Sequence, residues 1–368
     1  MWIHEYKNWT KFYWDNETLA LKLANVRHQQ GLLLGKMTNF GFELKQEASL
    51  NTLTNDVIKS SAIEGKDLSP DEVRSSIAQR LGINIAGLIP ASRDVEGIVE
   101  IMLDATQNYN STLTKERMFD WHAALFPTGR SGMHKITVAG WRTIKTGPMQ
   151  VVSGPIGHET VHSEAPGASR LNKEMLSFIK WFNKTDSTDP VLRAGIAHLW
   201  FVTLHPFEDG NGRIARAIAD MALAFSDGTS NRFYSMSTQI EKERKDYYEQ
   251  LEQQQHSKPD ITPWLEWFLD CLLRSISNAQ DTLNRVLYKQ KLWNKVNQES
   301  VNNRQRIIIN RMLENDFIGY MNTSKYAKMT NCSNDTALRD IQELKKRGIF
   351  IHNLGGGRST SYRLAEEV

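Results

Sequence analysis

The run HPFEDGNGRIAR, from His205 to Arg216, combines residue types that can handle a polyphosphate. His205 follows the apolar segment AGIAHLWFVTL and can act as a base, while Asp209 is a carboxylate that can hold a divalent cation. The glycines beside Asn211 let backbone N–H groups approach an anion, and Asn211 adds an amide donor. Arg213 and Arg216 share one face at the positive end of the next helix, an arrangement that favours an anion between them. The chemistry indicated is attack on phosphorus, catalysed by positioning and charge.

Each of these residue types also occurs in ordinary helix–loop–helix turns whose arginines face solvent. Their concentration in one short run favours the phosphate site.

Helices must hold this run in place, and the sequence predicts them on both sides. Apolar residues recur at helical spacing over 94–108, 114–125, 171–183, 190–204, 212–225, 238–255 and 261–284. One intervening stretch, TIKTGPMQVVSGPIGHETVHSEAPG, is rich in β-branched residues and broken by Gly-Pro pairs, which indicates a β-hairpin or ordered flap. Ser69 and Pro70 predict the start of an earlier helix, and Gly82 its end.

The run His205–Arg216 also matches the signature H-[PFx]-x-x-[DE]-G-N-G-R-x-x-R at every defining position, so the chain resembles the Fic family from Ser92 to Arg285. The resemblance implies a mainly α fold with a helical core, and transfer of AMP from ATP to a Ser, Thr or Tyr hydroxyl of a target protein. It makes His205 the general base that deprotonates this hydroxyl, before attack on the α-phosphorus releases pyrophosphate. Asp209 would bind Mg²⁺ bridging the α- and β-phosphates.

The same resemblance assigns the ATP phosphates to the loop and the start of the helix. The backbone from Gly210 to Arg213 and the amide of Asn211 would hold the anion. Arg213 would contact the triphosphate, and Arg216 the γ-phosphate. Gly212 stands where the kinase-like Doc branch carries a bulkier residue that reorients the nucleotide, so glycine favours nucleotidyl transfer over phosphorylation.

The run SSAIEG, from Ser60 to Gly65, fits the inhibitory motif [ST]-x-x-x-E-[GN] of the Fic family, in the form that precedes the core. The resemblance implies that Glu64 pairs with Arg216 when ATP is absent and occupies the γ-phosphate position, braced by Ser60 one turn earlier. Alone, this short pattern also suits an ordinary helix C-terminus. In some relatives the same glutamate positions a water that removes AMP from a target, so AMP removal stays open as an alternative.

The segment HETVH, from His158 to His162, spells the zinc-protease pattern H-E-x-x-H. That pattern works on a helix, whereas on a strand residues four apart are separated by ~13 Å, too far to share one zinc. The family resemblance instead implies that the flap around Met149–His162 aligns the target segment by strand addition. His122 and His198 lie in apolar helical contexts and are expected to be core residues.

The chain has 368 residues, 40% hydrophobic and 24% charged, which excludes a wholly disordered protein. Its two cysteines, Cys271 and Cys332, exclude a disulfide framework. The polar N-terminus and the absence of an apolar run of roughly 18 residues lead us to expect a cytoplasmic protein with no membrane partner. We expect an N-terminal helical region at 1–90 with the inhibitory motif, a Fic core at 91–285, and a linker helix with a final domain at 286–368.

The last quarter of the chain holds the basic excess, with 15 Lys and Arg against 8 Asp and Glu from Arg285 to Val368. Its order of a helix, a helix-turn-helix and a Gly-tipped hairpin predicts a winged helix. The recognition helix would be Asn334–Arg347, with Arg358 on the wing. Its basic residues are Arg339, Lys345, Lys346 and Arg347.

The partner of this module would be DNA, through residues 303–366. Dimerisation, giving a homodimer, or target docking is the alternative, since Asp335, Asp340 and Glu343 dilute the basic face. A nucleotide-sensing, DNA-binding transcriptional regulator is therefore the non-enzymatic alternative, although a pure sensor needs no base such as His205.

Overall fold

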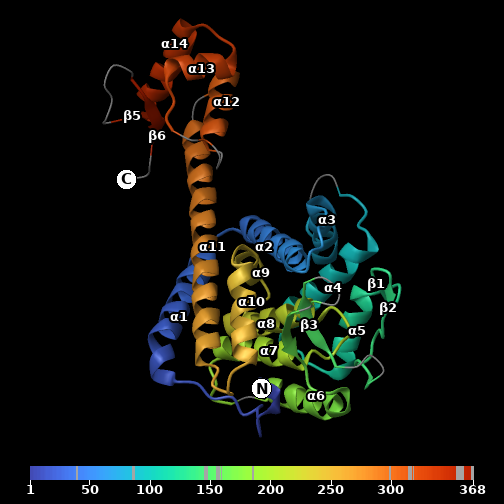
Figure 1. Cartoon of the computed structure of the whole chain (residues 1–368). Coiled ribbons are helices and arrows are strands. Elements are labelled where there is room, and N and C mark those ends of the chain that lie inside the picture. The colour runs from blue at the N-terminus through green and yellow to red at the C-terminus, as the bar shows by residue number, and fades with distance from the viewer. Residues whose placement is uncertain are drawn as a thin grey trace. The chain divides into compact units, whose positions relative to one another are not determined.

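The computed structural model divides the chain into two compact units, Met1–Gln280 and Asp281–Val368. It describes residues 1–38, 40–84, 88–144, 148–154, 158, 160–184, 186–297, 300–313, 317, 319–353 and 360–365. In this described part the fold is mainly α, as predicted, and the strands form only two-stranded sheets (Figure 1). None of the helices within these ranges combines the length and apolar character that crossing a lipid bilayer requires.

The first unit is built around α7 (Pro190–Leu204) and α8 (Asn211–Asp227). The elements before them are η1 (Ile3–Glu5), α1 (Asn16–Thr38), α2 (Phe42–Ile63), α3 (Pro70–Leu81), α4 (Arg93–Gln107), α5 (Lys115–Leu125), β1 (Arg130–Ser131), β2 (His134–Lys135), β3 (Gln150–Ser153), β4 (Thr160–Glu164) and α6 (Ala168–Phe182). Those after them are α9 (Met236–Lys242), α10 (Arg244–Gln255) and α11 (Thr262–Val296), which crosses into the second unit. The sequence predicted that α11 would end near residue 284, but it continues because residues 285–296 contain no glycine or proline.

Helix α7 is buried along nearly its whole length, as expected for a helix that is apolar on all sides. Gly195 permits close contact with α11, since a Cβ there would lie 3.0 Å from side-chain atoms of Leu265 and Phe268. Trp264 of α11 also donates to the Gly195 carbonyl at 2.8 Å. This packing holds α7 against α11, and His205 follows at the C-terminal end of α7.

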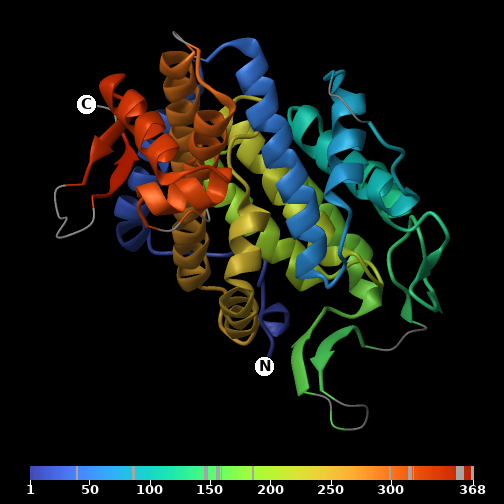
Figure 2. The ribbon, with the colours of Figure 1, turned by 90° about the horizontal axis from the view of Figure 1, so that it is seen from above.

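Helix α2 packs against α3, α8 and α9, and Figure 2 shows it in blue above the yellow-green helices of the core. It ends at Ile63, and Gly65 follows in the left-handed region with φ +74°. This turn leaves Glu64 at the end of α2, beside α8.

The structure confirms the predicted boundaries of α3. Ser69 is the N-cap, with its hydroxyl accepting from the backbone N–H of Glu72, and Pro70 is the first helical residue. Gly82 ends the helix at φ +65°.

The predicted flap contains the antiparallel pair β3–β4, while residues 155–157 and 159 lie outside the described residues. His162 on β4 fastens this hairpin to α10, because its Nδ1 lies 2.9 Å from Glu252 Oε2 and its Nε2 2.6 Å from Ser153 Oγ. His162 therefore lies on a strand and uses both ring nitrogens within the protein. Strand β3 is exposed along its length.

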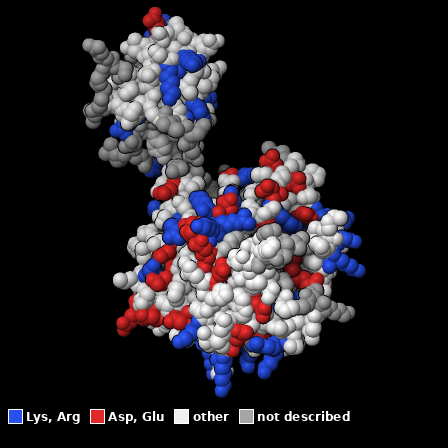
Figure 3. Space-filling model, in the orientation of Figure 1, with Lys and Arg blue, Asp and Glu red and all other residues white. Residues whose placement is uncertain are grey.

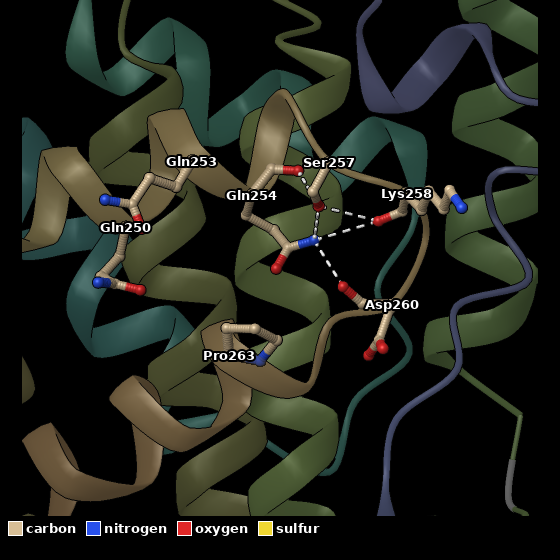
Figure 4. A pocket seen from close by; sticks show the side chains of 7 residues that line it. All are labelled: Gln250, Gln253, Gln254, Ser257, Lys258, Asp260 and Pro263. Atoms are coloured by element: carbon tan, nitrogen blue, oxygen red, sulfur yellow. Dashed lines mark hydrogen bonds between the residues drawn. The ribbon is translucent and has the colours of Figure 1, made fainter.

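Gln254 organises the turn between α10 and α11 (Figure 4). Its Nε2 donates to Ser257 Oγ at 2.7 Å and to the Asp260 carbonyl at 2.9 Å. A cavity of about 350 Å³ lies at this turn, and none of the signature residues lines it. Its lining is Gln250, Gln253, Gln254, Ser257, Lys258, Asp260 and Pro263.

The second unit contains, after α11, α12 (Asn303–Met312), α13 (Thr323–Thr330), α14 (Asn334–Lys346), β5 (Phe350–His352) and β6 (Tyr362–Leu364). They follow the order that the sequence predicted, and β5 pairs with β6 in an antiparallel hairpin. The core of the second unit includes Ile308, Tyr326, Ile341, Leu344 and Phe350. The turn 355–357 and Arg358 lie outside the described residues, so the predicted wing contact stays a prediction.

Candidate active site

Helix α8 starts directly at the glycine loop and leaves its N-terminal N–H groups without a side-chain cap. Gly210 is the N-cap residue at φ +84°, a conformation that favours glycine. A Cβ there would also lie 2.9 Å from the ring of Phe126. Uncapped N–H groups at the positive end of a helix form a site for an anion.

Asn211 is held in the loop by its own side chain. Its side chain is buried, its Oδ1 accepts from Phe207 N at 2.9 Å, and its Nδ2 donates to Phe207 O at 2.9 Å. The amide therefore fixes the loop, and its contact with an anion stays a prediction.

His205 ends α7 in a left-handed conformation, at φ +45°, and Arg142 Nε donates to its carbonyl at 2.7 Å. Its Nδ1 lies 3.3 Å from the Val202 carbonyl, so this nitrogen carries the proton and Nε2 keeps its lone pair. Burial lowers the pKa of His205 to about 4. The imidazole is therefore neutral at pH 7 and able to accept a proton.

His122 of α5 is buried, as expected, but it also supports the signature loop. Ala139 N donates to its Nδ1 at 3.2 Å, so the Nε2 proton points to the Asp209 carbonyl, 3.2 Å away. The ring stacks on Phe207 at 4.1 Å, and burial lowers the pKa of His122 to about 4. The sequence carried no local signal for this contact, because the partners lie 87 residues apart.

Asp209 presents a carboxylate that is 40% exposed beside the loop. The Ser131 hydroxyl donates to Oδ2 and the Gly210 N–H to Oδ1, while Arg213 Nη2 lies 3.9 Å from Oδ1. No group of three or more His, Cys, Asp or Glu side chains that could hold a metal is found within the described ranges. A single accessible carboxylate suits Mg²⁺, which is usually held by one or two carboxylates together with substrate phosphates.

Both signature arginines are buried, Arg213 at 5% and Arg216 at 2% exposure. Arg213 lies over the ring of Phe126, and its Nε has no hydrogen-bond partner among the described residues. Arg216 Nη1 likewise has none there. Because buried donors without partners are unfavourable, these N–H groups suit a bound polyanion.

The predicted inhibitory motif contacts Arg216 directly. Glu64 Oε1 lies 2.8 Å from Arg216 Nη2, and Arg216 also donates to Ser60, from Nε to Oγ at 2.9 Å and from Nη2 to the carbonyl at 2.8 Å. The Glu64 carboxylate lies so close to Gly212 that a Cβ there would overlap it. Glu64 thus takes up space at the start of α8. Tyr248 of α10 donates to the Ile63 carbonyl at 3.3 Å, next to Glu64 along the chain.

His198 is buried in α7, with its Nε2 2.8 Å from the Tyr247 hydroxyl, and burial lowers the pKa of His198 to about 3. Below about pH 6.5 the imidazole of His198 binds a proton in the unfolded chain but stays neutral in the folded protein. Its contribution to the free energy of unfolding therefore falls by about 1.4 kcal/mol per pH unit. We therefore expect the difference in unfolding free energy between wild type and His198→Asn to shrink as pH falls from about 6.5 to about 4. Urea titrations of both proteins across this pH range test the prediction, with His28→Asn, at an exposed position of α1, as the control. A difference that stays constant with pH would contradict the prediction.

Residues 112–223 match the family model described as Fic/DOC family, and residues 2–83 match one described as a domain of unknown function, DUF4172. The chain is 28% identical over 225 residues to protein adenylyltransferase Fic of Culex quinquefasciatus, covering 60% of this chain and 40% of that protein. It is 33% identical over 113 residues to the protein of the same name from Nematostella vectensis, covering 30% and 25% respectively. This chain therefore spans less than half the length of either relative.

A crystal structure of a Fic family protein from Desulfovibrio desulfuricans resembles this chain with a TM-score of 0.53 at 19% identity, covering 94% of this chain and 97% of that one. This likeness shows the fold.

Proposed function

Because residues 112–223 match the Fic/DOC family model, we propose that this protein transfers AMP from ATP to a hydroxyl group of a target protein. The observation that supports it most is the pair of buried arginines with unpaired N–H groups at the uncapped start of α8, close along the chain to the neutral His205. The relatives named protein adenylyltransferase point the same way.

The reaction would run as an in-line displacement at the α-phosphorus. The target hydroxyl oxygen forms a bond to this phosphorus, the bond to the bridging oxygen breaks, and pyrophosphate leaves. The hydroxyl proton passes to Nε2 of His205. Arg213, Arg216 and the first N–H groups of α8 would hold the phosphates, and a Mg²⁺ on Asp209 would offset charge between the α- and β-phosphates. The exposed strand β3 would align the target segment.

We further propose that the Glu64–Arg216 pair inhibits this reaction. A γ-phosphate and the Glu64 carboxylate would compete for the same guanidinium, so ATP can bind productively only when Glu64 moves away. Ser60 would keep the Arg216 side chain in place both when Glu64 contacts it and when Glu64 has moved away.

Intact-mass measurement after incubation with Mg-ATP tests the proposed activity, since self-modification would add the mass of AMP. The Glu64→Gly variant should show the adduct strongly and wild type weakly. If neither protein forms an adduct, alone or in lysate with tagged ATP, transfer is rejected. Incubation with an AMP-modified target then tests AMP removal through a water positioned by Glu64.

A second candidate function, DNA binding by residues 281–368, is favoured by the placement of Asp340 on α14. Its carboxylate is buried and accepts from Arg304 Nε at 2.8 Å, Asn302 Nδ2 at 3.0 Å and the Tyr326 hydroxyl at 3.1 Å. This acidic residue, which was expected to dilute the basic face, is therefore turned inward.

Glu343 accepts from Gln305 Nε2 at 3.0 Å but is exposed, as are Arg339, Lys345 and Lys346. On the face of this unit seen in Figure 3, basic patches are prominent and little acidic surface is visible. A basic helix face of this kind suits the phosphates of duplex DNA.

Replacing Arg339, Lys345 and Lys346 together with alanine is expected to weaken binding of a short mixed-sequence duplex. Each lost phosphate contact should reduce the slope of log affinity against log salt by about 0.9, so the slope should fall by roughly 2–3. Fluorescence anisotropy of the full chain over a salt series measures it, with Lys245→Ala in the first unit as control. An unchanged slope, or no binding by wild type, would exclude this face.

A further inference from the structure

Behind the inhibitory ion pair, the interface between α2 and α8 holds buried ionisable residues. Asp56 lies one turn before Ser60 on α2, and Asp220 lies one turn after Arg216 on α8. Each aspartate therefore shares a helix face with a residue of the Ser60–Arg216 contact. Arg232, from the segment that joins α8 to α9, interacts with both aspartates. Asp56, Asp220 and Arg232 are each exposed by 1% or less.

A third carboxylate, Asp227, belongs to the same group and is well supplied with donors. Arg232 Nη1 donates to it at 2.8 Å, the Tyr234 hydroxyl at 2.8 Å, and Gln30 Nε2 at 2.9 Å. Three donors, one of them charged, allow Asp227 to remain an anion.

The two other aspartates have fewer donors. Asp56 Oδ1 accepts from the Ser235 hydroxyl at 2.6 Å and the Ser237 N–H at 3.2 Å, while its Oδ2 has no partner among the described residues. For Asp220 the described residues provide Arg232 Nη2, at 3.4 Å, and nothing for Oδ2. Asp220 is therefore the least compensated of the three.

The charges in this interior do not balance if all three carboxylates are ionised. Arg232 offsets one of them, and Arg216 is already engaged by Glu64 and Ser60. An unpaired buried anion is so unfavourable that the group takes up a proton instead. We propose that Asp220 is protonated in the inhibited protein, and that this proton allows α2 to stay docked on α8.

The surrounding groups support this assignment. Burial and the neighbouring Asp56 raise the pKa of Asp220 well above its usual range. The charged groups that act on Asp220 are Asp56, Arg232, Arg216 and Asp227. Further out, Arg27 of α1 and Tyr234 act on Asp227, and His198 of α7, kept neutral by burial, faces Arg216.

The consequence for regulation rests on the proposed function. While Asp220 holds its proton, α2 keeps Glu64 on Arg216 and the enzyme is inhibited. When rising pH removes the proton, two carboxylates of like charge face each other across α2 and α8. The interface then loosens, and Glu64 leaves Arg216 more often.

The first measurement is thermal unfolding against pH, which needs no enzymatic activity. A carboxyl with a raised folded pKa stabilises the protein at low pH and loses this contribution as pH rises through that pKa. Asparagine mimics the protonated carboxyl without titrating. The loss begins near pH 4, where the carboxyl of the unfolded chain ionises. We therefore expect the melting temperatures of Asp220→Asn and wild type to differ least near pH 4. Asp220→Asn should melt increasingly higher as pH rises toward the folded pKa, by roughly 2–4 °C or more at about pH 8.5. Asp56→Asn is the second variant, since it removes the opposing charge. Asp120→Asn, at an exposed position of α5, is the control.

The second measurement is the ratio of AMP-transfer rates between Glu64→Gly and wild type at each pH. This ratio cancels the pH dependence of the chemistry and reports the strength of the inhibition. It should fall by about threefold or more from about pH 6.5 to about pH 8.5. In the Asp220→Asn background the corresponding ratio should stay constant.

If the melting temperatures of wild type and both asparagine variants change equally with pH, the proposal that Asp220 is protonated is overturned, whether or not AMP transfer occurs. If the melting curves are as expected but the ratio of rates between Glu64→Gly and wild type does not change with pH, the link to inhibition is overturned. The proposed activity is then unaffected. Absence of AMP transfer in Glu64→Gly would instead reject the proposed function, and the melting curves would still decide the proton.

Discussion

Replacing Glu64 with glycine is expected to raise the rate of AMP transfer by roughly 10- to 150-fold. A charge-assisted hydrogen bond contributes about 1.5–3 kcal/mol, which corresponds to this range in the population able to bind ATP productively. The bond concerned joins Glu64 Oε1 to Arg216 Nη2 at 2.8 Å. Glycine is tolerated there because Glu64 lies past the last residue of α2.

Initial rates with labelled ATP, for wild type and Glu64→Gly at equal concentration, measure this effect. Glu64→Gln keeps the size but removes the charge, so it should be activated less than Glu64→Gly and more than wild type. The matched control is Glu249→Gln, at an exposed glutamate of α10. A Glu64→Gly enzyme no faster than wild type would show that the pair does not inhibit.

Replacing His205 is expected to lower the rate of AMP transfer by about 10²–10⁴-fold, the usual contribution of a general base. Asparagine is the better substitution, since it tolerates the left-handed backbone at φ +45° that alanine would strain. ATP affinity should change little, because the proposed phosphate contacts lie on α8 and not on the imidazole.

The His205 experiment belongs in the Glu64→Gly background, where inhibition does not mask the chemistry. Rates and ATP affinity are measured separately, and a variant that loses both in proportion would contradict a role as base. The neutral imidazole is the active form, so the rate should fall as pH drops through the pKa of His205, which burial holds at about 4. The value of kcat/KM should therefore stay level down to about pH 6, where an ordinary histidine of pKa about 6.5 would already be protonated.

Several features of this protein were predictable because their causes are local. The capping residues of α3, the glycine loop before α8 and the turn-rich flap all depend on residues within a few positions of one another. The run His205–Arg216 belongs to this class, since its residue types and spacing point to a phosphate site before any fold is known. The mainly α fold follows from helical spacing repeated along most of the chain.

Other features depend on how the folded chain packs around a side chain and so on whether that side chain points inward or to solvent. Asn211 looked like an anion ligand from its place in the motif, and only the fold shows that its amide contacts Phe207. Asp340 looked like part of an exposed face, yet it is buried against Arg304. In both cases residue type and position were known, and only packing decides where the side chain points.

The sequence by itself determined the local elements and the kind of chemistry that its signature run can support. The tertiary structure decided which distant residues meet: Ser60 with Arg216, 156 positions apart, His122 with Asp209, and three aspartates with Arg232. The physical reason is that periodicity and capping act over a few residues along the chain. Contacts between α2 and α8, and the buried charges they enclose, exist only when the helices pack and exclude water.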